Sequence, residues 1–404
     1  AATPAWVCKS LWKGLLFKDL EETAREWMAI LREKEKPDVV IGLFHSGGNA
    51  RMVADRYKDD VSLEIARQVP GFDIVLMGHD HTLCNEKIVN VNGDSVLVIN
   101  PGHEGAKVAD VSLQIIVDEG KVIRKQVCGQ LVDVDEYEPD PVFLKQFDKA
   151  QQLTSRFVSK KIGVITETMT TRPAYFGPSA FVDYLHSLQL DITGADISFA
   201  SPLSFDAQIT RGDISVGDMF RLYRYKNLIY TMTLTGKEVR DYLEESYAQW
   251  TNQMLSPDDH LLLFRDNYLL QGEESFTNMY YYFDSAAGII YTVNVTKPKG
   301  EKVDILCMSD GSAFHEDRHY DVAMTSYRAN GGGDLLTKGA GLSVDALDSR
   351  VKAITQKDFR YYLIQSIKID KVIHPDVLNH WKFIPEDWVK AATEKDYLYL
   401  FGED

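Results

Sequence analysis

Two short apolar runs, DVVIGLF at residues 38–44 and FDIVLM at residues 72–77, most constrain how this chain can fold. Each run follows a helical pattern and ends in a loop that contains histidine and glycine. Apolar residues at helical spacing predict one helix over 19–36, before Pro37, and another over 59–69. Continuous apolar strands of this kind are typical of sheets covered on both faces. The chain is therefore predicted to begin with α/β units.

The rest of the first region is predicted to form antiparallel strands. Residues 95–102 and 107–134 have strand patterns, and a Glu-Gly pair inside the second segment is a hairpin signal. Pro and Asp residues at 138–141 break the chain, and 142–162 then has the pattern of one long helix. We place the domain boundary at this helix.

The second half of the chain is predicted to be a separate α+β domain. Helical and strand patterns alternate after the boundary, a hairpin is predicted at 288–308, and a strand is predicted to end in three glycines at 331–333. The expected fold class is therefore α/β and α+β. We expect domains at 1–137 and 163–404, joined by a helical linker at 138–162.

Charge and composition exclude several classes of protein. The formal net charge of −16 disfavours nucleic-acid binding, which depends on Lys and Arg neutralising phosphates. No stretch approaches the roughly 18 to 20 consecutive apolar residues of a membrane span, so a soluble protein is expected. The four cysteines lie far apart and form neither a disulfide framework nor a zinc knuckle. The chain opens AATPAWVCKS, without Met or a signal sequence, so we expect that upstream residues were removed.

Three histidines are candidate metal ligands. His45 follows the first apolar run, and His79 and His81 follow the second in the sequence GHDH. Strand ends of an α/β sheet converge on one crevice, and neutral imidazole is a common ligand of zinc, manganese or iron. In an extended segment both GHDH histidines would point the same way, with Asp80 turned aside and Gly78 leaving room for an ion. The alternative is a set of hydrogen-bonded polar residues, and the pattern alone leaves both open.

Longer segments resemble one enzyme family. DVVIGLFHSGGNA, FDIVLMGHDHT and VLVINPGHEGAKVADVSLQI are similar to the last part of the metallophosphoesterase domain of the 5′-nucleotidase and 2′,3′-cyclic-nucleotide 2′-phosphodiesterase family. GADISFASPLSFDAQITRGDISVGDMFRLYRYKNLIYTMTLTGKEVRDYLE and YDVAMTSYRANGGGDLLTKGAG are similar to its C-terminal nucleotide-binding domain. The resemblance implies the C-terminal part of a metallophosphoesterase β-sandwich flanked by helices, followed by an α+β substrate-binding domain.

The resemblance also implies a site for two divalent metal ions, Zn, Mn, Co or similar, that clamp a phosphate and activate water. His45 and His79 match ligands of the second ion and His81 a ligand of the first, while His103 is expected to be a polar loop residue near them. The family's other ligands come from an Asp-x-His motif, a bridging Asp and a Gly-Asn-His motif that also supplies a catalytic His. These motifs would lie upstream of the segments matched here. The metal site is therefore expected to be incomplete, and no catalytic residue is assigned.

In its C-terminal domain the family binds the base between two aromatic rings, which suits any base because each has an apolar face. Tyr225 and Tyr327 match these rings, and Asn227 matches a polar residue beside the first. The loop after Tyr327 is expected to approach a ligand through its backbone amides. Its candidate binding residues are Asn330, Gly331, Gly332 and Asp334, although the loop has one more glycine before its Asp than the common family form.

The segment SPLSFDAQI lacks the glycine run and arginine that nucleotidases usually carry, and Arg172 or Arg328 is a candidate to replace that arginine. Together with the segment LYRYKN, this difference favours the cyclic-phosphodiesterase-like branch or an unusual phosphoesterase over an AMP-type 5′-nucleotidase. Three functions remain open: hydrolysis of nucleotide phosphoesters, a catalytically inactive module that binds nucleosides, or a purely structural or adhesion protein that binds neither nucleoside nor metal. The expected partner is a nucleotide or nucleoside. The resemblance implies a periplasmic, secreted or cell-surface location.

Overall fold

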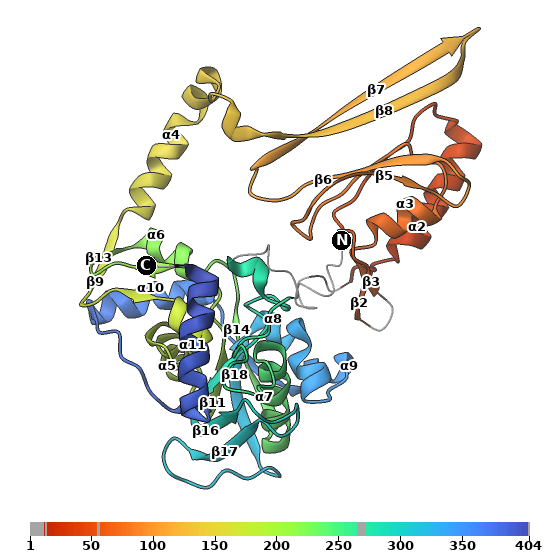
Figure 1. Ribbon diagram of the computed structural model, residues 1–404. Coiled ribbons are helices and arrows are strands. Elements are labelled where there is room, and N and C mark those ends of the chain that lie inside the picture. Colours follow the sequence, from red (N-terminus) through yellow and green to blue (C-terminus); the bar gives the residue numbers. More distant parts are fainter. Residues whose placement is uncertain (1–11, 13, 55–56, 266–271, 403–404) are drawn as a thin grey trace. The chain divides into compact units, whose positions relative to one another are not determined.

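The computed structural model describes residues 12, 14–54, 57–265 and 272–402. The chain divides into two compact units, Ala1–Phe147 and Asp148–Asp404 (Figure 1). The division falls inside α4 (Pro141–Val158). This helix is shorter than the predicted helix over 142–162, because Lys161 and Ile162 belong to the next strand. No residue of α4 is buried.

The first unit is built on a mixed four-stranded sheet of order β1-β4-β6-β5. β1, β4 and β6 are parallel, and β5 is antiparallel to β6. The strands are β1 (Ile41–Leu43), β4 (Ile74–Leu76), β5 (Leu83–Val89) and β6 (Ser95–Pro101). The helices are α2 (Leu20–Ile30), which continues as a π-helical turn over Leu31–Glu35, and α3 (Ser62–Gln68). Each predicted α/β unit therefore places a helix before a parallel strand.

The edge strand β1 is less covered than its apolar sequence predicts. Ile41 is 54% and Leu43 81% exposed, whereas Gly42 between them is buried. Side chains alternate between the faces of a strand, so both exposed residues lie on one face. No residue in the described part of the chain buries that face, and the expectation of a strand covered on both faces is wrong for β1.

Two hairpins complete the first unit. One is the predicted hairpin, β7 (Lys107–Asp118) with β8 (Lys121–Asp133), whose turn places Glu119 and Gly120 at φ 46° and 77°. The other pairs β2 (Arg51–Ala54) with β3 (Tyr57–Asp59) and was not predicted. Because β3 takes Asp59 and the backbone turns at Asp60 (φ 58°), α3 starts later than the predicted helix over 59–69.

The second unit is built on a five-stranded sheet of order β15-β11-β18-β14-β19, with three smaller sheets of order β13-β9-β20, β17-β16-β21 and β10-β12. The large sheet contains β11 (Ile197–Ala200), β14 (Ile229–Thr235), β15 (Ser285–Ala287), β18 (His319–Thr325) and β19 (Val351–Ile354). The smaller sheets contain β9 (Lys161–Ile165), β10 (Met169–Thr170), β12 (Gln208–Ile209), β13 (Gly212–Ser215), β16 (Ile289–Asn294), β17 (Val303–Met308), β20 (Val372–Ile373) and β21 (Trp381–Ile384).

Helices surround these sheets in the second unit. They are α5 (Ala180–Thr193), α6 (Val216–Leu222), α7 (Gly236–Trp250), α8 (Ser326–Ala329), α9 (Val344–Arg350), α10 (Phe359–Asp370) and α11 (Glu386–Phe401). Local sequence explains where α7 begins, since the side chain of Thr235 accepts from Glu238 N and the Glu238 carboxylate accepts from Thr235 N. Gly236 is required next, because a Cβ there would lie 2.2 Å from the His315 carbonyl oxygen.

The predicted combination of α/β and α+β architecture is confirmed. The core of the second unit includes the stacked rings of Phe199 and Tyr242, whose centroids lie 4.0 Å apart. In the antiparallel pairing of β14 with β18, Ile229 lies opposite Thr325. This register brings the segments 225–228 and 326–330 to the same end of the large sheet. Within the described segments, no helix has the length and apolar character needed to cross a membrane.

Candidate metal centre and nucleoside site

His45 and His79 lie beyond the carboxyl ends of the neighbouring parallel strands β1 and β4. The loops after these strands stay hydrogen-bonded, since Gly78 N donates to Ser46 O at 3.3 Å. The imidazole atoms His45 Nε2 and His79 Nδ1 lie 3.2 Å apart. The structure therefore brings together two of the three histidines singled out in the sequence.

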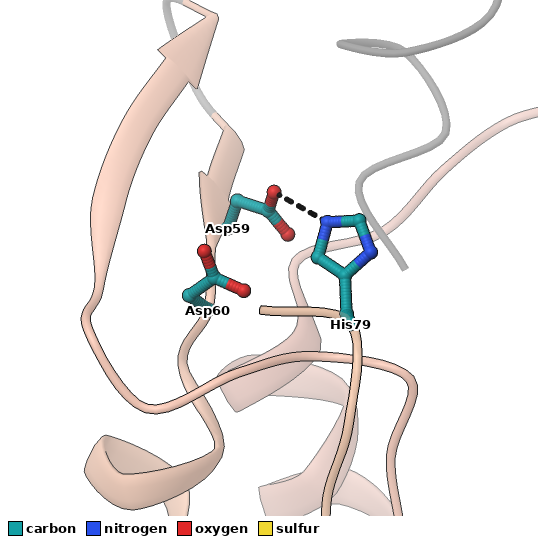
Figure 2. Close-up of side chains that lie close together, drawn as sticks. All are labelled: Asp59, Asp60 and His79. Carbon is teal, nitrogen blue, oxygen red and sulfur yellow. Dashed lines mark hydrogen bonds and ion pairs between the residues drawn. The ribbon is translucent and has the colours of Figure 1, made fainter. Parts of the chain in front are cut away.

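The other nitrogen of His79 faces a buried carboxylate (Figure 2). His79 Nε2 lies 3.1 Å from Asp59 Oδ2, and the Asp59 side chain is 0% exposed. Asp60, also buried, accepts from Gly47 N at 2.8 Å. Ligand atoms of Asp59, Asp60 and His79 all lie within 4.8 Å of one another.

The two aspartates were missed in the sequence, because DDVSLEIARQV fits the start of a helix. The signal that points to them is the adjacent pair of carboxylates in the segment between the two histidine loops. Carboxylates at a helix start usually remain solvated, so their burial could be recognised only in the structure.

His81 lies against a different partner, His103. The two imidazoles are stacked, with centroids 4.7 Å apart and planes 17° from parallel. His79 and His81 have φ values of 84° and 58°, so the GHDH segment is not extended and the alternation of side chains along a strand does not apply to its histidines. Burial, followed by the neighbouring charges of His103 and His79, lowers the pKa of His81 and so favours its neutral form.

Asp80 is turned away from the histidines and ties the loops together. Its carboxylate accepts from Gly48 N at 2.9 Å and from Asn100 Nδ2 at 2.8 Å. A Cβ at Gly47 would lie 2.3 Å from Asp80 Oδ2, whereas a Cβ at Gly78 would meet no atom within 4 Å. Gly47 is therefore the glycine required by close packing between protein atoms, and the expectation that Gly78 leaves room for an ion stays a prediction.

The donor set fits a divalent transition metal ion. Two nitrogens that each lie about 2.1 Å from one ion are about 3.2 Å apart when the angle at the ion is about 100°, between octahedral and tetrahedral values. His45 Nε2 and His79 Nδ1 have this separation. The same distance also suits an N–H···N hydrogen bond when no ion is bound. Imidazole nitrogens are suitable ligands for Zn, Mn or Co.

In the second unit, Tyr225 lies beside Tyr281, and Tyr327 lies beside Tyr282. Tyr225, in the loop between α6 and β14, is 41% exposed, and its ring meets the ring of Tyr281 edge-on at 5.7 Å. Burial, followed by the neighbouring Tyr282, raises the pKa of Tyr327. Tyr281 also interacts electrostatically with Tyr327. The two rings expected to hold a base thus border one tyrosine-rich segment, residues 280–282.

Asn227 is buried and connects the two segments that carry these rings. Its Oδ1 accepts from Ser326 Oγ at 3.3 Å, and its Nδ2 donates to Tyr223 Oη at 3.4 Å. Only 8% of the residue is exposed. Asn227 therefore supports the position of Tyr327 through the adjacent Ser326.

The glycine-rich loop follows α8, so Tyr327 lies in a helical turn and not at the end of the predicted strand. Gly331 and Gly333 have φ values of 92° and 76°, a conformation that favours glycine. A Cβ at Gly332 would lie 2.4 Å from the Tyr327 ring, so this glycine packs directly against the ring. Two further candidates make local contacts: Asn330 Nδ2 donates to Ser326 O at 2.7 Å, and Asp334 pairs with Lys338.

Arg328 is not available to a substrate. Its side chain is 3% exposed and forms a bidentate ion pair with Asp284, with both N···O distances 2.9 Å. The same guanidinium donates to the carbonyl oxygens of Tyr281 and Gly332. Its role as a replacement for the missing substrate-binding arginine is therefore excluded by burial. Arg172 is paired with Asp206 through Nε at 2.8 Å and Nη2 at 3.0 Å.

Comparison with known proteins shows what this chain is similar to. Residues 161–338 match the family model of the 5′-nucleotidase C-terminal domain. The chain is 24% identical over 407 residues to a trifunctional nucleotide phosphoesterase of Bacillus subtilis. It is 23% identical over 437 residues to a 2′,3′-cyclic-nucleotide 2′-phosphodiesterase/3′-nucleotidase of Salmonella typhimurium. The alignments cover 97% and 94% of this chain but 24% and 64% of the two relatives.

Solved structures share the fold. A Staphylococcus aureus protein classed with the 5′-nucleotidases superposes with a TM-score of 0.74 at 18% identity, over 94% of this chain and 70% of that one. A 5′-nucleotidase precursor of Thermus thermophilus superposes with a TM-score of 0.55 at 19% identity, over 92% and 68% of the two chains. Residues 161–338 thus match the 5′-nucleotidase C-terminal domain, and nearly the whole chain is similar to nucleotide phosphoesterases and cyclic-nucleotide phosphodiesterases.

Proposed function

We propose that this protein hydrolyses nucleotide phosphoesters with the help of divalent metal ions, of which His45, His79 and His81 hold part of the ligand set. The observation that carries the proposal is the 3.2 Å separation of His45 Nε2 and His79 Nδ1 at the ends of adjacent parallel strands. Relatives that match nearly the whole chain are named as nucleotidases and cyclic-nucleotide phosphodiesterases, which supports a nucleotide substrate.

Solvent exposure favours one side of the His79 ring for an ion. His45 is exposed, whereas Asp59 and Asp60 on the other side are buried. A phosphate can approach an ion only where solvent can also reach it. We therefore place the ion next to His45 Nε2 and His79 Nδ1. When bound, such an ion lowers the pKa of a coordinated water and offsets the charge that develops on the phosphate.

The residues of this chain have distinct tasks in the proposed reaction. His45 and His79 present ring nitrogens from two strand ends. The Asp80 carboxylate joins the two loops that follow these strands, and also Asn100, by accepting hydrogen bonds. His103 keeps the His81 ring in place by stacking. With a formal net charge of −16, the protein as a whole repels anions, so local cations are needed to attract a phosphate.

The second unit is proposed to bind the nucleoside. Tyr225 has an exposed ring, and Tyr327 and the glycine-rich loop lie at the same end of the large sheet. An aromatic ring can stack on any base, and alanine replacement of such a ring typically costs about 1–3 kcal/mol per base. The tyrosines therefore provide affinity, while the backbone amides of the loop are suited to polar groups of the ligand.

The proposal is tested with the complete gene product, including any residues that precede Ala1 in its reading frame. The protein is loaded with Mn²⁺, Zn²⁺ or Co²⁺ and assayed against 2′,3′-cyclic, 3′- and 5′-nucleotides. We expect turnover that is abolished by chelation. His79→Ala is expected to lower kcat/KM by more than the roughly 10- to 100-fold typical of residues that only support a ligand. No turnover of any ester by the metal-loaded protein would contradict the proposal.

The alternative function is a nucleoside-binding module without catalysis, favoured by the tyrosine cluster of the second unit. Calorimetry with adenosine in the presence of EDTA separates the two, because stacking needs no metal. Binding that is lost in Tyr225→Ala, together with no turnover by the complete protein, would establish the module.

A further inference from the structure

Asp59 lies where it can set the protonation of the His79 ring. Its Oδ2 is 3.1 Å from His79 Nε2, and its side chain has no exposed surface. A carboxylate can only accept a hydrogen bond when ionised, so the contact favours the His79 tautomer that carries its proton on Nε2. The lone pair of the neutral ring is then on Nδ1, which faces His45 Nε2 at 3.2 Å.

We propose that Asp59 is a positioning residue that holds His79 in the tautomer and orientation needed for metal binding through Nδ1. This inference rests on the proposed function, because it assigns Asp59 a role at the same metal centre. Carboxylate partners of this kind fix the orientation of metal-binding histidines and make them more basic.

The segment that carries Asp59 is fixed to the loop that carries His45. Asp60 accepts from Gly47 N at 2.8 Å, and Val61 N donates to Ser46 Oγ at 2.9 Å. Both contacts join the residues just after β3 to the residues just after His45. The Asp59 carboxylate, the His79 ring and the His45 ring are thus arranged by one set of short-range hydrogen bonds.

A competing arrangement would place an ion directly between Asp59, Asp60 and His79 Nε2. Their ligand atoms are close enough, within 4.8 Å of one another. Two observations favour the positioning role: both carboxylates are buried, which leaves a phosphate no access, and Asp60 Oδ1 already accepts from Gly47 N. The 3.1 Å contact is also a normal hydrogen-bond length.

The tautomer of His79 can be measured without metal by ¹⁵N NMR of the imidazole in the full chain. In the unchanged protein we expect a protonated Nε2 and an unprotonated Nδ1. Asp59→Ala removes the acceptor, so a substantial population with the proton on Nδ1 should appear. Asp59→Asn keeps an oxygen acceptor without charge and should give an intermediate result. Asp60→Asn is the matched control, since its carboxylate accepts from Gly47, and it should leave the His79 tautomer unchanged.

Titration with Co²⁺ or Zn²⁺ provides the second readout. We expect Asp59→Ala to weaken the affinity of the folded protein roughly 10- to 100-fold. Circular dichroism identifies any variant that fails to fold, in which case Asp59→Asn carries the test. An unchanged tautomer in Asp59→Ala, or a metal-induced ¹⁵N shift at Nε2 instead of Nδ1, would overturn the positioning role. If the unchanged protein binds no metal at all, the proposed function fails, whereas the tautomer result stands on its own.

Discussion

At the scale of single residues, the candidate metal centre depends on close packing between two loops. Gly47 follows His45 by two residues, and its Cα lies so near Asp80 that an added Cβ would be 2.3 Å from the carboxylate oxygen. Asp80 in turn sits between His79 and His81 in the chain and accepts from Gly48 N. Any displacement of Asp80 is therefore transmitted to both histidine loops.

Gly47→Ala is expected to lower the stability of the first unit by about 1–3 kcal/mol, the usual cost of forcing extra volume into a packed site. Because the clash is with backbone-anchored Asp80, affinity for Zn²⁺ or Co²⁺ should also fall. Gly78→Ala is the matched control for stability, since its Cβ would meet no protein atom within 4 Å and should change the free energy of unfolding little. Chemical denaturation and metal titration of the two variants provide the measurements. Equal effects of the two substitutions would contradict this account.

At the scale of elements, one buried ion pair organises the candidate nucleoside site. The guanidinium of Arg328, on α8, pairs with Asp284, just before β15, and donates to carbonyl oxygens of the tyrosine segment and of the glycine-rich loop. A buried ion pair is seldom a net source of stability, but it specifies geometry when all its hydrogen-bonding groups have partners. We interpret Arg328 as the residue that holds Tyr281 and Gly332 in place.

Helix α5 and the segment before β21 bury a second polar pair with a defined pH dependence. Asp183 Oδ1 and His380 Nδ1 lie 3.9 Å apart. Burial raises the pKa of Asp183 to about 6, and burial lowers the pKa of His380 to about 4. Between about pH 4 and 6, Asp183 therefore makes the free energy of unfolding fall as the pH rises, whereas His380 makes it rise. The two effects oppose each other in the unchanged protein.

Replacing one member of this pair should make the pH dependence that the other member contributes measurable. In Asp183→Asn the free energy of unfolding should increase from pH 4 to 6.5 more steeply than in the unchanged protein, and in His380→Gln it should decrease from pH 4 to 6. Each unit of pKa shift corresponds to about 1.4 kcal/mol. Urea denaturation at pH 4, 5, 6 and 7 tests this prediction. Curves that stay parallel to that of the unchanged protein would show that neither group titrates abnormally.

At the scale of the whole molecule, regular patterns in the sequence predicted the architecture well. Helix and strand periodicity gave the two α/β units, the β7–β8 hairpin and an α+β second half. The convergence of parallel strand ends placed His45 beside His79. These features depend on local patterns or on general rules of sheet geometry, both of which can be recognised in a single sequence.

Three of the errors share a physical cause, since each involves a contact between distant segments. Lys161 and Ile162 continue a helical pattern but lie in β9, which pairs with β13. Asp59 reads as the start of a helix, yet its carboxylate is buried against His79. Arg328 looks available to a substrate until its pairing with Asp284 is known. Tertiary contacts override local preference at all of these positions, and the sequence alone does not reveal the partners.

The most direct test of the central claim is the position of a bound metal ion in a crystal of the protein grown with Zn²⁺ or Mn²⁺, found by anomalous scattering. We predict a peak about 2.1 Å from both His45 Nε2 and His79 Nδ1. A peak on the opposite side of the His79 ring, between Asp59 and Asp60, or no peak at either place, would contradict it.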